Sequence, residues 1–353
     1  MRKVATDKKE DKARFKAVIL GASGYAGSEL VRLLSCHDFI EVVALCGDRK
    51  AGLDYARVYP HLSHLNAPRL KAFDQIDFSD IDLVFSAMPH STSASNIKKI
   101  PNDIKVIDLS ADFRIKNLKD YEYWYGLKHP YPEGVRESVY GLTEFYRDRI
   151  RSARIVACTG CNAATALYPL LPLLKHKLID VSNIIVDIKT GISGAGRSLR
   201  EGLLHSEISE GVAPYGLSGH RHLAEIRQEL SYIAGECIDL TFIPHLLPQN
   251  RGILGSIYVN GDAKLIHKIL TKHYESEYFI YVLPFGEAPS TKHIRGSNFC
   301  HIGVIKGTKG NQTILFCAID NLVKGSAGQA LQNANLVLNI DEQHALKAGP
   351  IFP

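Results

Sequence analysis

Cys161 is the residue of this sequence that is best placed to do covalent chemistry. It follows a run of small and β-branched residues, VACTG at 156–160, and a strongly apolar run, NAATALYPLL, starts directly after it. This order predicts a strand, a tight turn and a helix, with the cysteine in the first helical turn. A thiol there meets unpaired backbone N–H groups and the positive end of the helix dipole, and both favour the thiolate. We therefore interpret Cys161 as a candidate catalytic nucleophile.

Two histidines, His220 and His222, are the candidates for a general acid/base. Imidazole is the side chain that most readily exchanges protons near neutral pH. A spacing of two residues is poor for one helix face, although it allows both rings to lie together on a strand or at a loop–helix junction. A buried, hydrogen-bonded structural histidine is the competing interpretation.

These groups need a scaffold, and its first part is a glycine-rich run, GASGYAG at 21–27, between a buried strand and an amphipathic helix. This is the setting of a dinucleotide-binding motif. Gly21 allows the tight turn, Gly24 lets the backbone approach a pyrophosphate, and Gly27 lets helix and strand pack closely, while the helix N-terminus offers N–H donors to phosphates. The predicted cofactor contacts are Gly21, Ser23, Gly24, Tyr25, Ala26 and Gly27. A purely structural turn is the alternative.

The residues after the second predicted strand, at 40–45, bear on the choice of cofactor. A site that prefers NAD usually has an acidic residue there for the ribose hydroxyls. Here the chain reads CGDRK at 46–50, so Arg49 and Lys50 could hold a 2′-phosphate, whereas Asp48 favours NAD. We expect NADP(H), with Arg49 as a contact; a charged surface loop is the other interpretation.

Further strands are predicted at 81–86 and 106–109, each followed by polar residues. Strands that alternate with helices indicate an α/β fold, a Rossmann-type doubly wound parallel sheet whose ligand crevice lies beyond the carboxyl ends of the strands. Ser86 and Arg114 should lie near that crevice. Arg114 could bind a carboxylate or phosphate with two N–H groups, or form a structural salt bridge. The segment 120–149, rich in Tyr, His and Pro, is expected to be an ordered loop.

The second half of the chain has a different character. Strands are predicted at 183–190, 238–242, 254–260, 299–305 and 313–319, with few helices between them, which indicates an α+β domain with a mixed or antiparallel sheet. A glycine loop, GISGAGR at 191–197, includes Ser193, Gly194 and Arg197 and should contact substrate or nicotinamide. We place the nucleotide domain at 15–157 and 325–353 and the catalytic and oligomerisation domain at 158–324.

Composition excludes several classes of protein. The 353 residues are 45% hydrophobic and 22% charged, and no apolar run approaches the ~20 residues needed to cross a bilayer. The formal net charge of +5 is spread along the chain, so no nucleic-acid partner is expected. Seven irregularly spaced cysteines indicate a reducing compartment rather than a disulfide framework. Residues 1–14, polar and charged, are expected to form a mobile tail and not a secretory signal.

Cys158 and Cys161 also form a Cys-x-x-Cys pair. A zinc site would need two more ligands, and no second pair supplies them, so no metal is expected. A redox pair remains possible, but a nicotinamide domain would be superfluous for dithiol exchange. A buried packing role for Cys161 is the remaining alternative.

Taken together, the motifs closely resemble those of the N-acetyl-γ-glutamyl-phosphate reductases, within the aspartate-semialdehyde dehydrogenase superfamily. The matching segments occur in family order over about residues 15–338: 21–30, 109–114, Gly160-Cys161, 193–197, His220-Arg221-His222 and 320–325. The resemblance implies a cytoplasmic homo-oligomer, a dimer or tetramer, that acts in arginine biosynthesis and reduces an acyl phosphate with NADPH by way of a thioester on Cys161.

The resemblance also implies roles for individual residues. The family's acid/base histidine corresponds best to His220; Arg114, Arg197, Ser193, His222 and Glu225 would contact substrate, and Ser86, Gly194 and Asn321 the cofactor. The helix after Lys324 would return to the nucleotide domain and bring Asn321 and Lys324 towards the cofactor.

One departure from the family pattern concerns the substrate. Many members have Tyr-Pro-Thr after the nucleophile, whereas this chain has Asn162-Ala163-Ala164. An asparagine there is also typical of relatives in lysine biosynthesis that act on a carrier-linked aminoadipyl phosphate; aspartyl phosphate is another candidate. A non-catalytic NADP-sensing protein with the same fold is an alternative of a different class.

Overall fold

The computed structural model describes residues 14–352, so most of the tail expected at 1–14 lies outside the described residues. The first of its two sheets is entirely parallel, as alternating strands and helices predict. Its spatial order is β3 (Leu70–Lys71), β2 (Ile40–Cys46), β1 (Phe15–Leu20), β4 (Leu83–Ser86), β5 (Lys105–Asp108), β7 (Ile155–Cys158) and β6 (Val139–Gly141). The reversal of order beside β1 creates the crevice in which doubly wound sheets bind ligands.

The helices of this half have at most 10 residues. They are α1 (Tyr25–Leu34), α2 (Tyr55–Val58), α3 (Thr92–Ile97), α4 (Leu118–Tyr125), α5 (Pro132–Glu137) and α6 (Thr143–Ser152). The prediction of a loop over 120–149 was therefore wrong, because that segment contains helices and the edge strand β6. The side chain of Asn117 caps α4 by accepting a hydrogen bond from the Lys119 N–H, and Gly126 ends it at φ 71°.

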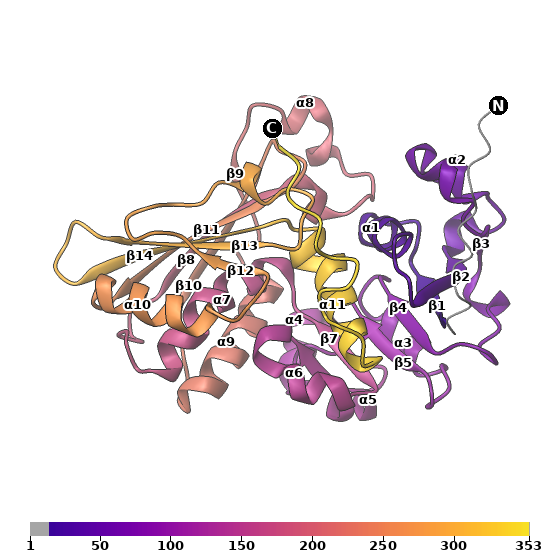
Figure 1. Ribbon diagram of the computed structural model, residues 1–353, viewed down its shortest axis with the longest axis horizontal. Coiled ribbons are helices and arrows are strands. Elements are labelled where there is room, and N and C mark those ends of the chain that lie inside the picture. Colours follow the sequence, from indigo (N-terminus) through magenta and orange to yellow (C-terminus); the bar gives the residue numbers. More distant parts are fainter. Residues whose placement is uncertain (1–13, 353) are drawn as a thin grey trace.

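The second sheet is mixed, as predicted. Its order is β12 (Ile280–Val282), β13 (Cys300–Lys306), β14 (Gln312–Ile319), β11 (Ile253–Asn260), β8 (Ile185–Gly191), β10 (Thr241–Leu247) and β9 (Ala213–Pro214). The pairs β8–β10 and β12–β13 are parallel and the others antiparallel. Figure 1 shows α7 (Cys161–Lys175), α9 (Arg221–Ala234) and α10 (Ala263–Tyr274) gathered on one face of this sheet.

Helix α7 links the two sheets. It starts two residues after β7 and its sequence is apolar on every side, so 13 of its residues are buried. The last helix, α11 (Gly328–Val337), packs beside α1 and α6, and the Asn333 side chain donates a hydrogen bond to the Gly141 carbonyl, 3.0 Å away. The chain therefore returns to the first sheet, and the start of α7 lies where the two halves meet (Figure 1).

No helix in residues 14–352 is long and apolar enough to span a membrane. All seven cysteines are free thiols.

Candidate active site

The turn that carries Cys161 is held by a buried carboxylate. Glu225, on α9, has an exposed fraction of 2%, and its Oε1 accepts hydrogen bonds from the Gly160 N–H and the Tyr140 hydroxyl, each at 2.7 Å. Its Oε2 lies 3.5 Å from Nη1 of Arg114. Because one carboxylate binds the turn, a tyrosine and an arginine at once, it fixes the entry of α7. The family resemblance implies that Glu225 contacts substrate; in this structure both of its carboxylate oxygens bind groups of the protein.

Gly160 is required at this turn. A Cβ atom on it would lie 2.5 Å from His222 Nε2 and 2.7 Å from Arg114 Nη1, closer than atoms can approach. A second glycine, Gly325, has the same function on the other side, because its Cβ would lie 2.7 Å from the Cβ of Cys161. Gly325 belongs to a π-helical turn, Val323–Ala327, a distortion often found at functional sites. Sequence reasoning did not assign either role.

The ionisation predicted for Cys161 is not found. Burial raises the pKa of its thiol to about 11, although Arg114 and the Asn162 N–H lower it in part. The thiol is therefore protonated at neutral pH in the ligand-free protein. The N–H group at the helix start and the charge of Arg114 do favour the thiolate, but the free-energy cost of desolvating the thiolate is larger than both. Cys158 is buried as well, and burial raises the pKa of its thiol to about 12.

The two histidines lie together at the start of α9, as a loop–helix junction allows. His220 is the N-cap residue, and its Nδ1 accepts the His222 N–H at 3.1 Å. The two ring centroids are 4.7 Å apart. Burial, followed by the nearby Arg221, lowers the pKa of His220 to about 4. Burial, His220 and Arg114 lower the pKa of His222 well below its ordinary value. Both rings are therefore neutral at pH 7, and Nδ1 of His222 is buried without a hydrogen-bond partner.

Asn162, the residue that departs from the family pattern, is 2% exposed and donates a hydrogen bond to the Tyr215 hydroxyl at 3.0 Å. Burial raises the pKa of Tyr215 to about 12, with a contribution from Cys161. The ring of His220 lies edge-on to Tyr215, with centroids 5.3 Å apart. Asn162 thus connects the nucleophile turn to the histidine turn through Tyr215.

The glycine-rich loop has the form that a dinucleotide requires. Gly21 has φ 75°, and a Cβ there would lie 2.5 Å from the Ala87 carbonyl oxygen; a Cβ on Gly27 would lie 2.5 Å from the Gly21 oxygen. A Cβ on Gly24 would meet only the Gly21 oxygen, at 3.4 Å, so this side of the loop is open. No side chain caps α1, which leaves the N–H groups of its first turn, beside Tyr25 and Ala26, available to phosphate.

Two tyrosines that sequence reasoning missed hold this loop. Tyr55 donates a hydrogen bond to the Ala22 carbonyl at 3.1 Å, and the Tyr59 hydroxyl lies 2.9 Å from the carbonyl oxygens of both Ser23 and Gly24. A residue of the second domain lies here too: the Arg197 guanidinium is 3.3 Å from the Ser23 carbonyl and 4.6 Å from the centre of the Tyr59 ring. The predicted substrate residue Arg197 is thus at the nucleotide loop.

The other predicted contacts are divided between the crevice and the protein interior. Ser86 is fully buried and its hydroxyl lies 2.7 Å from that of Ser93. The Asn321 amide donates to the Ser193 hydroxyl at 2.8 Å and accepts from the Gly252 N–H at 2.8 Å, so these two polar residues bind each other. Gly194 and Arg49 are exposed.

Lys324, which the resemblance places towards the cofactor, is bound in this structure by two side chains of the protein. It is fully buried, and its Nζ donates to Glu144 Oε1 at 2.5 Å and to Gln332 Oε1 at 2.8 Å. It joins the π-helical turn to α6 and α11, which makes it structural.

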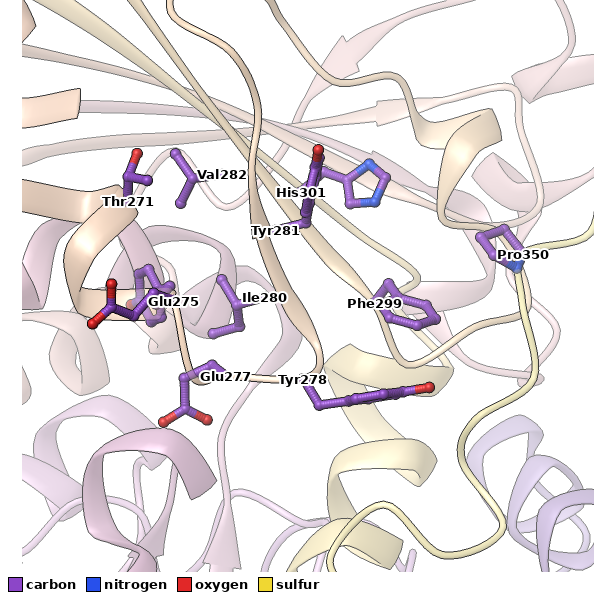
Figure 2. A pocket seen from close by; sticks show the side chains of 11 residues that line it. Thr271, Glu275, Glu277, Tyr278, Ile280, Tyr281, Val282, Phe299, His301 and Pro350 are labelled. Carbon is purple, nitrogen blue, oxygen red and sulfur yellow. The ribbon is translucent and has the colours of Figure 1, made fainter. Parts of the chain in front are cut away.

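One cavity lies away from these residues. It has a volume of 570 Å³ and is bordered by α10, the edge strand β12 and Pro350 near the C-terminal end, with Tyr278, Tyr281 and Phe299 in its wall (Figure 2). No cysteine lines it, so volume does not identify the chemical site. A second cavity, of 470 Å³, adjoins the nucleotide loop between Tyr25 and Arg197. Within residues 14–352, no group of three His, Cys, Asp or Glu side chains could hold a metal ion.

Comparison with known proteins agrees with this arrangement. Residues 16–153 match the semialdehyde dehydrogenase NAD binding domain, and residues 161–321 match the semialdehyde dehydrogenase dimerisation domain. Among solved structures, aspartate semialdehyde dehydrogenase II of Vibrio cholerae, complexed with ASA, has a TM-score of 0.71 and 17% identity over 93% of this chain and 99% of that one. The Candida albicans enzyme with NADP has a TM-score of 0.64 and 18% identity over 92% and 99%. At these identities the likeness shows the fold.

Sequence relatives are much closer. N-acetyl-gamma-glutamyl-phosphate reductase of Cereibacter sphaeroides strain KD131 is 54% identical over 336 residues, 95% of this chain and 98% of that one. The enzyme of the same name from Roseobacter denitrificans is 54% identical over 340 residues, 96% and 99%. The chain is therefore an oxidoreductase that belongs to the N-acetyl-gamma-glutamyl-phosphate reductase family.

Proposed function

We propose that this protein reduces N-acetyl-γ-glutamyl phosphate to N-acetylglutamate semialdehyde and phosphate, with NADPH as reductant, in the cytoplasm as a step of arginine biosynthesis. The observation that carries the proposal is the Cys161 turn. A thiol at a helix start, with a buried arginine and two neutral histidines around it, beside a dinucleotide loop, suits reduction through a thioester.

The first step uses groups of this chain. The Cys161 sulfur attacks the acyl carbonyl carbon as its proton passes to His222, whose Nδ1 has no other partner. Transfer during the attack is needed because burial keeps the thiol protonated. The bond from carbon to the phosphate oxygen then breaks, hydrogen phosphate leaves with the proton that His222 accepted, and a thioester remains on Cys161. The Arg114 guanidinium, whose Nε is buried without a partner, offsets the negative charge of the substrate.

The second step releases the aldehyde. When bound, NADPH supplies a hydride to the thioester carbonyl. His220 donates a hydrogen bond to the carbonyl oxygen as it gains charge, because the His222 N–H occupies its Nδ1 and so leaves the proton on Nε2. The resulting thiohemiacetal collapses, the aldehyde departs, and Cys161 takes up a proton from solvent by way of the histidine pair.

The cofactor choice rests on the turn after β2. Asp48, which would favour NAD, accepts the Phe73 N–H at 2.9 Å through its Oδ1. Arg49 is exposed beside it. Because a backbone N–H already occupies Asp48 and the Arg49 guanidinium is exposed, this turn favours a ribose that carries a 2′-phosphate over one that carries a 2′-hydroxyl.

The substrate choice follows from Asn162. Because the Asn162 side chain is buried and hydrogen-bonded to Tyr215, we infer that it supports the Cys161 turn and does not contact a carrier-linked substrate. The relatives named for N-acetyl-γ-glutamyl phosphate then favour that substrate. The match to a dimerisation domain supports a homo-oligomer.

The test runs the reaction in reverse. Purified protein given N-acetylglutamate semialdehyde, phosphate and NADP should produce NADPH, at least about 100-fold faster than with aspartate semialdehyde or carrier-linked aminoadipate semialdehyde, a difference of roughly 2.7 kcal/mol. Equal or greater rates with either alternative would refute the substrate assignment. A greater rate with NAD than with NADP would refute the cofactor assignment.

A further inference from the structure

Arg197 is one of the cationic side chains that extend from the second domain to the nucleotide domain. It follows β8 and a short turn, Ile192–Ala195, and Gly196, at φ 81°, redirects the chain just before it. Its guanidinium lies 3.3 Å from the Ser23 carbonyl and 3.5 Å from the Val58 carbonyl, and it covers the Tyr59 ring.

The charge of Arg197 is not balanced by the protein. Within the described part of the chain, no carboxylate lies within ion-pair distance of it, and the side chain is exposed. Arg251 provides a contrast near the same helix: it binds Glu29 of α1 at 2.8 and 3.1 Å and lies 3.7 Å from Asp320. Arg251 is therefore a structural link between the domains. Arg197 uses two of the five N–H donors of a guanidinium, which leaves donors for an anion.

The position of Ser23 indicates which anion. A Cβ on Gly47 would lie 3.1 Å from the Ser23 hydroxyl oxygen, so Ser23 faces the turn after β2 that carries Arg49. In doubly wound sheets this turn lies beside the ribose 2′ position, whereas the pyrophosphate lies at the helix N-terminus. Arg197 also contacts the Val58 carbonyl and the Tyr59 ring, in the segment that follows this turn, and so lies on the ribose side of the loop.

We propose that Arg197 reaches across from the second domain to bind the 2′-phosphate on the adenosine ribose of NADPH, and so helps to select that cofactor. The inference rests on the proposed function and replaces the substrate role that the family resemblance implies for this residue. It also gives the second domain a direct contact with the cofactor half that does not react.

The test measures equilibrium binding of 2′,5′-ADP and of 5′-AMP, which lacks the 2′-phosphate, by titration calorimetry of the full chain. Arg197→Gln should weaken 2′,5′-ADP binding by about 10- to 100-fold, the range for a lost charge-assisted hydrogen bond, and change 5′-AMP binding less than about twofold. Arg197→Lys should recover part of the loss, because it restores a point charge without the planar fork.

Arg200→Gln is the matched control, since Arg200 lines the same cavity three residues along the loop and its removal changes the charge equally. It should leave both affinities within about twofold. Equal weakening of both nucleotides by Arg197→Gln, no weakening of either, or the same loss in the Arg200 variant would overturn the assignment. If the unaltered protein binds 5′-AMP as tightly as 2′,5′-ADP, both the role of Arg197 and the proposed preference for NADPH are refuted. The other three outcomes refute only the role of Arg197.

Discussion

The Cys161 turn and the Arg197 loop are two sides of one crevice, and they are built in opposite ways. Beside Cys161 the side chains of Glu225, Arg114 and Asn162 are buried. One carboxylate, Glu225, binds the turn, Tyr140 and Arg114. Around Arg197 the loop is exposed, including Leu199 at 97%, and the guanidinium contacts only backbone oxygens and one ring. We infer from this difference that the Cys161 turn is held in position before ligands bind, whereas the exposed loop that carries Arg197 can adjust when a cofactor binds.

The largest expected effect comes from removing the nucleophile. Cys161→Ser should lower kcat by roughly 10⁴-fold or more, because loss of a covalent nucleophile removes the thioester route. Its unfolding midpoint should stay near that of the unaltered protein, since the volumes are similar. Cys158→Ser, at the end of strand β7 in the same Cys-x-x-Cys pair, is the control and should retain most activity. Steady-state assays measure kcat, and thermal unfolding shows whether each variant is folded. Retained turnover in the Cys161 variant would refute covalent catalysis.

The next effect tests whether the buried carboxylate positions the turn. Glu225→Gln keeps the shape but leaves Arg114 without its counter-charge, so kcat should fall by about 100-fold, as expected for small displacements of reacting groups. Free energy of unfolding should fall by about 3 kcal/mol. The Michaelis constant should change little if Glu225 does not touch substrate. A raised Michaelis constant with normal kcat would instead indicate direct substrate binding.

A third change tests whether the buried ion pair of Lys324 and Glu144 contributes to stability without contributing to the rate of reaction. Lys324→Met leaves Glu144 buried and unpaired, so chemical denaturation should show a loss of about 3 kcal/mol with kcat nearly unchanged in the folded fraction. Burial tends to raise the pKa of Glu144 and Lys324 lowers it below its ordinary value, so the carboxylate depends on this partner. The double variant Lys324→Met with Glu144→Leu should regain most of the stability. No recovery would show that the remaining hydrogen bonds, to Tyr168 and Gln332, matter more than the charge pair.

The smallest effect concerns acid stability of the nucleotide half. His37 accepts the N–H groups of Phe39 and Ile40 through Nδ1 and lies 3.0 Å from Asn335 Oδ1 through Nε2, and burial lowers its pKa to about 4. The unfolded chain, with a pKa near 6.5, binds a proton more readily, so stability falls as pH drops from about 6.5 to about 4. His37→Asn, which keeps an acceptor and does not titrate, should make that fall shallower. An unchanged slope in urea denaturation across this pH range would contradict the assignment.

The sequence was most informative where a local pattern determines structure. The strand, glycine turn and helix at 15–34, the helix start at Cys161 and the mixed second sheet all follow from short-range periodicity and turn residues, and all are confirmed. The helix α4 was missed although its signals, Asn117 and Gly126, are present, because its aromatic composition resembles that of a packed loop.

Long-range partnerships had no such signal. Glu225 meets Gly160 across 65 residues and Lys324 meets Glu144 across 180, and no spacing rule connects either pair. The prediction that the Cys161 thiol is ionised was wrong for the same reason. The helix start can be seen in the sequence, but the burial that outweighs its effect depends on Arg114, Gly325 and α9, which surround the turn. The sequence therefore points to Cys161 as the candidate nucleophile, but it does not reveal the groups that set the pKa and position of that thiol.

The central claim, an acyl group carried on Cys161, has a direct measurement. The protein is mixed with N-acetyl-γ-glutamyl phosphate in the absence of nucleotide, quenched in acid and analysed by peptide mass spectrometry, while released phosphate is counted. We predict one phosphate released per active site and an N-acetylglutamyl adduct on the peptide that contains Cys161, which disappears when NADPH is added before the quench. Steady turnover with NADPH but no adduct and no initial phosphate release without it, or an adduct on another residue, would contradict the thioester mechanism.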